Sequence, residues 1–340
     1  MSLSRFFEDW NSSSPFITVK TSGSTGEPKQ ISVEKKRMVA SAKRTCQALG
    51  LREGDTALLC LPLEFIAGKM MVVRSIVGGL KLIVVEPSGH PLQLLDTLTT
   101  HVDFAAMTPM QVYNSMMRPD ELKRLKAVNK LIIGGGPVSQ DLAAELLKFP
   151  NDVWSTYGMT ETLSHIALRR LSGTDASEWY EPLTGVSLSL NHEGCLVVDA
   201  PDICPEKLIT RDRAEIMEDE GGISRFRVLG RIDNVINSGG VKIQIEEVER
   251  VLSSYMKHPF LVAPSPDPKF GQIVVLLTTA DPDIVTSLVD AIPLDVLPKY
   301  HRPRHIIQID DIPLTPTGKP ARALAARIAA QKMILKINKK

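Results

Sequence analysis

The sequence predicts an α/β protein whose larger, N-terminal part is built on a mostly parallel sheet. Two observations predict this class: short runs rich in Leu, Ile and Val recur along the first half of the chain, and helical patterns separate several of them. Such runs are typical of parallel strands buried on both faces, and they span residues 56–63, 81–86, 102–108, 128–133 and 152–156. A chain of 340 residues, 43% of them hydrophobic, can bury a sizeable core and is long enough for two domains.

Between residues 130 and 156 the pattern predicts one complete strand–helix–strand crossover. Three glycines end the first strand, and Ser139 is suited to cap the N-terminus of a helix that runs to Leu147. Ligands of open α/β sheets bind at the carboxyl ends of the strands. We therefore expect the glycine turn and the turn at Tyr157 and Gly158 to face the same crevice.

The composition changes after about residue 230, and we place a domain boundary near Asp233. A segment rich in glycine and asparagine precedes an amphipathic helix, whose apolar face carries Ile245, Val248, Val251, Leu252 and Tyr255. The patterns that follow indicate a strand at 273–279, a helix at about 283–297, a strand at 304–309 and a helix from about 320. These elements predict a compact α+β domain at the C-terminus.

Charge and cysteine content favour a protein that acts on a small molecule. The 40 basic and 39 acidic residues give a formal charge of +1, without an extended basic patch that would attract nucleic acid or an anionic membrane. The four cysteines have no CxxC spacing, which argues against a metal cluster or a dense disulfide framework and favours a reducing compartment. No signal-peptide pattern or long apolar segment is found, so we expect a cytoplasmic protein.

The segment Thr21–Lys29, with the sequence TSGSTGEPK, is suited to binding a polyphosphate. Its glycines permit close backbone approach to an anion, its hydroxyls donate hydrogen bonds and its lysine adds charge. A Walker A loop does not fit, because Pro28 precedes the lysine and Gln30 follows it. By itself the segment could also be a flexible connector. The candidate phosphate-binding residues are Thr21, Ser22, Gly23, Ser24, Thr25, Gly26 and Lys29.

This loop and four later motifs resemble, in the same order, those of the acyl-adenylate-forming enzymes. The later motifs are Thr156–Glu161 (TYGMTE), Thr210–Asp212 (TRD), Gly230–Asp233 with Gly239–Lys242 (GRID and GGVK), and Pro313–Lys319 (PLTPTGK). The resemblance implies that family's fold, shortened at the N-terminus because only twenty residues precede Thr21. It implies a large α/β domain over residues 1–230, a hinge at 231–234 and a small mobile α+β domain over 235–340.

The resemblance also implies ATP and Mg²⁺ as ligands. The phosphate loop would hold the β- and γ-phosphates, Thr160 would contact the α-phosphate, and Glu161 would offer Mg²⁺ a carboxylate oxygen. Tyr157 would stack on the adenine, and Asp212 would accept hydrogen bonds from the ribose. The other implied nucleotide contacts are Gly134, Gly135, Gly136, Pro137, Thr156, Gly158, Met159 and Arg231.

The same resemblance implies that the C-terminal motifs contribute to catalysis and to the binding of coenzyme A. Lys319 would bring its ammonium group to the carboxylate and the α-phosphate, and Asp233 would be the hinge residue. Out of context, Lys319 would be interpreted as a solvated loop lysine. Gly239, Gly240 and Lys242 would face the pantetheine arm, although the two glycines could also form an ordinary turn.

The segment Leu61–Gly68 and the arginine after it are most similar to the o-succinylbenzoate–CoA ligases of menaquinone biosynthesis. Their substrate has a second carboxylate, which needs a cationic or hydrogen-bonding partner. Phe65 would line the acid pocket, and the candidate partners are Lys69, Arg74 and His165. Three residues depart from the family pattern: Glu64 and Phe65 stand where Phe and His are usual, and Arg211 replaces a glycine.

Two other functions remain open at this point. An adenylation domain that loads a carrier protein would share all five motifs, and a noncatalytic nucleotide-binding module could be built from a shortened enzyme. The acid substrate and the choice between a monomer and a homo-oligomer are not decided by the sequence.

Overall fold

The computed structural model describes residues 1–20, 30–93, 95, 101–218, 224–315 and 319–337. The chain forms two compact units. The first comprises Met1–Asn191, Leu196–Thr210 and Ile216–Arg227, and the second comprises His192–Cys195, Arg211–Glu215 and Val228–Lys340. The hinge at residues 231–234 remains a prediction. In the described part of the chain, no helix combines the length and the apolar character needed to cross a membrane.

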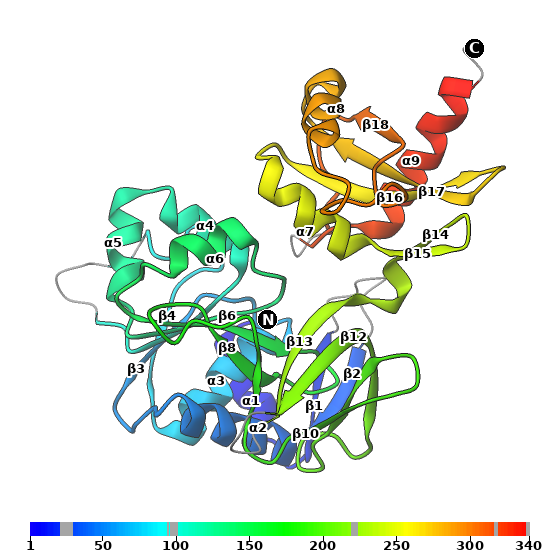
Figure 1. Ribbon diagram of the computed structural model, residues 1–340. Coiled ribbons are helices and arrows are strands. Elements are labelled where there is room, and N and C mark those ends of the chain that lie inside the picture. The colour runs from blue at the N-terminus through cyan, green and yellow to red at the C-terminus, as the bar shows by residue number, and fades with distance from the viewer. Residues whose placement is uncertain (21–29, 94, 96–100, 219–223, 316–318, 338–340) are drawn as a thin grey trace. The chain divides into compact units, whose positions relative to one another are not determined.

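A seven-stranded sheet with the order β4-β3-β5-β6-β7-β8-β9 lies at the centre of the first unit (Figure 1). Its parallel strands are β3 (Thr56–Leu59), β4 (Lys81–Val84), β5 (Phe104–Met107), β6 (Lys130–Ile133) and β7 (Asp152–Gly158). The antiparallel strands β8 (His165–Arg170) and β9 (Glu181–Pro182) complete it. The predicted α/β class is confirmed, and every predicted apolar run contains a strand.

Helices cover both faces of this sheet because its connections run in two directions. From β3 the chain passes through α3 (Ile66–Gly78) to the edge strand β4. From β5 it moves the other way, through α4 (Pro109–Met116), α5 (Pro119–Ala127) and α6 (Gln140–Leu146). Since such crossovers are right-handed, the two directions place their helices on opposite faces. Figure 1 shows α4, α5 and α6 on one face, and α3 beside α2 (Lys35–Ala48) on the other.

The predicted cap of α6 is confirmed: Ser139 accepts a hydrogen bond from the backbone N–H of Leu142, at 3.2 Å. The connections run in opposite directions from β3 and from β5, so the strand order reverses between these two neighbouring strands. Ligands of open α/β sheets bind at such a position, at the carboxyl ends of the strands.

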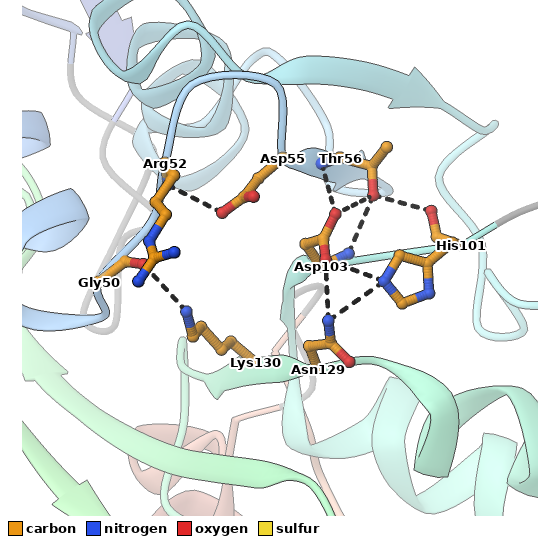
Figure 2. A network of polar contacts seen from close by, with 8 residues as sticks. All are labelled: Gly50, Arg52, Asp55, Thr56, His101, Asp103, Asn129 and Lys130. Carbon is orange, nitrogen blue, oxygen red and sulfur yellow. Dashed lines mark hydrogen bonds and ion pairs between the residues drawn. The ribbon is translucent and has the colours of Figure 1, made fainter.

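A polar network joins the amino ends of three strands, opposite the carboxyl ends where ligands of such sheets bind (Figure 2). Asp103 Oδ2 accepts hydrogen bonds from the backbone N–H of Thr56 at 2.9 Å and from its hydroxyl at 2.8 Å. Asp103 Oδ1 lies 2.8 Å from Asn129 Nδ2 and 2.9 Å from His101 Nε2. Burial alone would raise the pKa of Asp103, but the hydrogen bonds from Thr56 and His101 lower it. The network therefore stabilises an ionised carboxylate that aligns the starts of β3, β5 and β6.

The remaining elements of the N-terminal half include α1 (Leu3–Asn11) and a hairpin of β1 (Phe16–Lys20) and β2 (Gln30–Glu34). The hairpin brackets the predicted phosphate loop, Thr21–Lys29, which lies outside the described residues. A four-stranded sheet follows, with the order β10 (Ser187–Leu190), β11 (Cys195–Asp199), β12 (Leu208–Glu218) and β13 (Ser224–Arg231).

The second unit contains a five-stranded sheet with the order β15-β14-β17-β16, in which β18 also pairs with β17. Its elements are the 3₁₀ turn η1 (Ile232–Asn234), β14 (Val235–Ser238), β15 (Val241–Gln244), α7 (Ile245–Tyr255), β16 (Phe260–Asp267), β17 (Gly271–Thr278), α8 (Pro282–Asp290), β18 (His305–Gln308) and α9 (Arg322–Ile337). The predicted α+β architecture is thus confirmed. The helix predicted at about 283–297 is shorter, because Pro293 lacks an N–H and prevents its continuation.

Both faces of this sheet are covered, as the alternation of buried residues in its strands shows. Val274 and Leu276 of β17 belong to the core beneath α7 and α8. Ile273, Val275 and Leu277 of the same strand pack with Ala325 and Ala329 of α9 and the other residues of a second core.

Candidate active site

The turn between β7 and β8 carries the predicted catalytic residues Thr160 and Glu161. The hydroxyl of Thr162 accepts a hydrogen bond from the N–H of Met159 at 2.9 Å and lies 2.7 Å from the carbonyl oxygen of Ser164. Leu163 is buried and has a φ of 62°. A positive φ is strained for leucine, so the surrounding bonds must hold it. The tight turn leaves Thr160 half-buried and Glu161 exposed at the end of β7.

Gly158 allows this turn to fold back onto β7. A Cβ atom at this position would lie 2.3 Å from the carbonyl oxygen of Ser164 and 2.5 Å from the Cα of His165. The pairing of β7 with β8 shifts register between Tyr157 and Gly158. The close approach of the two backbones therefore requires glycine.

Tyr157 is held by other aromatic rings of the first unit. Its ring meets the buried Phe226 edge-on, with 5.1 Å between centroids, and lies 6.0 Å from the ring of Tyr180. The Tyr180 hydroxyl is 2.9 Å from Ser155 Oγ. Tyr157 is thus a half-buried, braced ring of the kind that can stack on a base.

The glycine turn lies beside the start of this motif. Thr156 donates a hydrogen bond to the carbonyl of Ile133 at 3.2 Å, and a Cβ at Gly134 would lie 2.5 Å from Thr156 Oγ1. Gly134 also donates to the carbonyl of Met107 at 3.0 Å. The structure therefore brings the ends of β5, β6 and β7 together, and Gly135, Gly136, Pro137 and Met159 continue the turns that leave them.

Four predicted residues form a charged group within the second unit. Arg231 Nη1 lies 3.1 Å from Asp212 Oδ1, and Arg231 Nη2 lies 3.3 Å from Asp233 Oδ2. Burial lowers the pKa of the half-buried Lys319; Arg231 lowers it further, whereas Asp212 opposes the shift. Arg211, which departs from the family pattern, forms an ion pair with Asp233. The arginine that replaces the usual glycine is thus paired with an aspartate from another of the family motifs.

Hydrogen bonds between Thr315 and Lys319, and between Arg322 and Glu249, hold the backbone on either side of this lysine. The N–H of Thr315 donates to the carbonyl of Lys319 at 2.7 Å, and the N–H of Lys319 lies 3.1 Å from Thr315 Oγ1. Arg322 then binds both carboxylate oxygens of Glu249 at 2.6 Å. Thr317 and Gly318, predicted to form a flexible loop, lie outside the described residues.

Gly239 and Gly240 form the two-residue turn between β14 and β15. Both have positive φ, 59° and 86°, as such hairpins require. The ring of Phe270 packs against Gly239, where a Cβ would approach it to 3.1 Å. Lys242 is exposed and opposite Asn237. The interpretation as an ordinary turn fits this geometry, and contact with coenzyme A remains a prediction.

The acid-site candidates Arg74 and His165 are brought together by a residue that the sequence analysis missed. Ser164 Oγ accepts a hydrogen bond from Arg74 Nη2 and lies 3.4 Å from His165 Nδ1. Arg74 and His165 are both buried, with 2% and 5% of their surfaces exposed. Burial lowers the pKa of Arg74 to about 10, and burial together with Arg74 holds the pKa of His165 well below its usual range. The place of Ser164 next to a predicted residue was the only sequence signal for it.

The two other candidates lie along the start of α3. Lys69 is 4% exposed, its ammonium lies 3.5 Å from the sulfur of Met1, and burial lowers its pKa while Asp9 opposes the shift. Phe65 is half-buried at the N-cap of α3.

Within the residues described, no three His, Cys, Asp or Glu side chains converge on a metal position. Mg²⁺ at phosphate-transfer sites commonly takes one or two carboxylates, with phosphate oxygens and waters completing its shell. The exposed carboxylate of Glu161 fits that requirement.

Comparison with known proteins agrees with these motifs. Residues 8–206 match the family described as AMP-binding enzyme. The 2-succinylbenzoate–CoA ligase of Listeria monocytogenes is 24% identical, over 93% of this chain and 70% of that enzyme. An acyl-CoA synthetase (AMP-forming)/AMP-acid ligase II-like protein from Dyadobacter fermentans is 35% identical, with a TM-score of 0.64 over 94% of this chain and 91% of that one.

A solved o-succinylbenzoate CoA synthetase from Bacillus subtilis, in complex with the acyl-adenylate intermediate OSB-AMP, has a TM-score of 0.73 at 22% identity. The match covers 91% of this chain and 68% of that one, which supports the shared fold. The family match spans more than half of the chain. The protein therefore belongs to the AMP-binding enzymes, the family of the AMP-forming acyl-CoA synthetases and ligases.

Proposed function

We propose that the protein joins o-succinylbenzoate to coenzyme A through an acyl-adenylate. The carboxylate attacks the α-phosphate of ATP and pyrophosphate leaves; the thiol of coenzyme A then attacks the acyl carbon and AMP leaves. Family membership supports the adenylate-forming reaction. The observation that carries the choice of acid is the buried, incompletely paired guanidinium of Arg74.

Arg74 has too few partners for a buried cation. Besides Ser164, the guanidinium contacts Met71, whose sulfur lies 3.6 Å from Nη1, and among the described residues Nε has no hydrogen-bond partner. A hydroxyl and a thioether do not compensate a buried charge, whereas a carboxylate does. At a pKa of about 10 the guanidinium remains charged at neutral pH. A substrate with a second carboxylate would supply the missing anion.

The side chains of the first unit would bind the nucleotide as their geometry allows. Tyr157 would stack on adenine beside the glycine turn, Thr160 would contact the α-phosphate, and Glu161 would hold Mg²⁺. The bound ion would supply positive charge to the phosphate oxygens. Asp212 and Arg231 would bind the ribose or a phosphate, Lys319 would serve adenylation, and Gly239, Gly240 and Lys242 would face coenzyme A.

Variants of Arg74 test the acid. Arg74→Met keeps much of the side-chain length but removes the charge, so kcat/KM for o-succinylbenzoate should fall about 30-fold, or roughly 2 kcal/mol. The same variant should lose far less with 4-oxo-4-phenylbutanoate, which lacks the ring carboxylate. Lys69→Met, measured on both acids, determines whether Lys69 shares the role. Parallel losses on the two acids would assign a structural role and remove the reason for choosing this acid.

We also propose that Asp233 is the hinge between the adenylating and thioester-forming states. Proline at this position fixes its own φ and restricts Ile232, so Asp233→Pro should leave ATP–pyrophosphate exchange largely intact and slow thioester formation. Asp233→Ala is the control, because it removes the ion pairs with Arg211 and Arg231 without restricting the backbone. An unchanged overall rate in Asp233→Pro would place the hinge elsewhere.

A further inference from the structure

A chain of hydrogen bonds runs from helix α2 to Arg74 through His165. Thr45, fully buried in α2, has its hydroxyl oxygen 3.2 Å from the carbonyl oxygen of Ser41 and 3.2 Å from His165 Nε2. On the other side of the imidazole, His165 Nδ1 lies 3.4 Å from Ser164 Oγ, which accepts a hydrogen bond from Arg74 Nη2. The acid-site arginine is thus connected to a helix that none of the sequence motifs includes.

Counting protons along this chain selects one tautomer of His165. If Nε2 carries the proton, it donates to Thr45, Thr45 donates to Ser41, and the Ser164 hydroxyl donates to Nδ1. Every proton then has an acceptor. If Nδ1 carries the proton, Ser164 must accept from both His165 and Arg74, and its own proton has no acceptor among the contacts of the described residues. A buried hydroxyl without an acceptor is costly, so the first arrangement is favoured.

The imidazolium form, with both nitrogens protonated, does not compete at neutral pH. His165 is buried and shares Ser164 with the positively charged Arg74, and both effects hold the pKa of His165 well below its usual range. The ring is therefore neutral, and its hydrogen bonds to Thr45 at Nε2 and to Ser164 at Nδ1 together decide which nitrogen carries the proton.

We propose that Thr45 is a positioning residue of the acid site, which fixes His165 as the Nε2–H tautomer so that Ser164 directs its lone pairs at Arg74. This inference deepens the proposed function and rests on it for the role of Arg74. In the fixed arrangement, Ser164 accepts from Arg74 alone, and the guanidinium keeps Nε available for a substrate carboxylate. The selectivity of the site for a dicarboxylate then depends on a threonine that touches neither substrate nor arginine.

Nitrogen NMR of protein labelled with ¹⁵N-histidine tests the tautomer directly. The chain has seven histidines, and the signals that disappear in His165→Gln identify this ring. The wild-type protein should show a protonated Nε2 and an unprotonated Nδ1, unchanged between about pH 6 and 8. Thr45→Val, which replaces the hydroxyl by a methyl group, should lose this single state, whereas Thr45→Ser should retain it.

The kinetic consequence separates positioning from general stability. In Thr45→Val, kcat/KM for adenylation of o-succinylbenzoate should fall about tenfold, the size of one lost hydrogen bond, while 4-oxo-4-phenylbutanoate should change by about twofold or less. Thr45→Ser should behave like wild type with both acids. Melting temperatures of the two variants monitor the loss of packing, which would affect both acids alike.

Three results would contradict either the role of Thr45 or the proposed acid, and the experiments distinguish between them. A protonated Nδ1 or an imidazolium in the wild-type protein would overturn the inference, as would equal losses on both acids in Thr45→Val. A wild-type enzyme that is inactive on o-succinylbenzoate would instead overturn the proposed acid. In that case the loss of the Nε2–H state in Thr45→Val would still support the hydrogen-bond chain.

Discussion

Replacing Lys319 by alanine is expected to lower acid-dependent ATP–pyrophosphate exchange by two or more powers of ten, which corresponds to about 3 kcal/mol or more. The lysine lies in the charged group of Asp212 and Arg231, and its ammonium would neutralise the charge that develops when a carboxylate attacks the α-phosphate. A supplied acyl-adenylate should still be converted to the thioester, because that half-reaction does not need the same charge.

The pH dependence of this step follows from the direction of the shift. Burial, aided by Arg231, lowers the pKa of Lys319 below the usual lysine value, and Asp212 only partly opposes it. The role proposed for Lys319 requires its ammonium form, so kcat/KM for adenylation should be full at neutral pH and decline as the pH rises through this lowered pKa. Lys319→Arg, whose side chain remains charged, should abolish the decline at alkaline pH even if its activity is low.

Lys332 offers a matched control in the same unit, since it is an exposed lysine of α9. Lys332→Ala should leave both half-reactions unchanged. Equal damage to adenylation and thioester formation in Lys319→Ala would contradict the assignment to the first half-reaction.

The sequence patterns predicted best the strands that are buried on both faces of the sheet. The strands β3, β5 and β6 are covered by helices on both faces, so their residues form continuous apolar runs that contrast with the polar turns around them. The cap at Ser139 depends on local sequence alone, since one hydroxyl and the backbone N–H three residues later, at Leu142, are sufficient.

Elements at sheet edges were harder to predict because their composition conflicts with strand propensity. β16 contains Pro264 and Pro266, which argue against a central strand. Among the described strands it pairs only with β17. Because the two prolines are two residues apart, the positions where their backbone N–H groups are missing lie on the same side of β16, away from β17. The four-stranded sheet of β10–β13 was also missed, since its exposed strands carry many charged residues.

In the candidate site, motifs placed the residues that follow strands β6 and β7, but not the contacts between distant segments. Thr45 and His165 are 120 positions apart, and Arg74 and Ser164 are 90 apart. Nothing in the local pattern around Thr45 distinguishes it from any other buried helix residue. Such contacts depend on how α2 and α3 pack beside the turn after β7, which only tertiary structure determines.

Gly158→Ala should lower the free energy of unfolding by about 3 kcal/mol and abolish most adenylation activity. The new Cβ would lie 2.3 Å from the carbonyl oxygen of Ser164, and the atoms it meets belong to the backbone, so no flexible side chain can move away. β7 and β8 must separate, which shifts Thr160 and Glu161 from their turn. The measurements are the melting temperature, chemical denaturation and ATP–pyrophosphate exchange.

Gly136→Ala is the matched control for this substitution. A Cβ there would be 3.8 Å from Pro109 Cγ, an ordinary contact, and Gly136 does not have a positive φ. Its free energy of unfolding should therefore stay within about 0.5 kcal/mol of wild type. Should Gly158→Ala be as stable as Gly136→Ala, the backbones of β7 and β8 could separate at little cost, and the close turn would not be what holds Thr160 and Glu161. A large loss of unfolding free energy in Gly158→Ala alone would instead show that the positions of Thr160 and Glu161 depend on the absence of a side chain at Gly158.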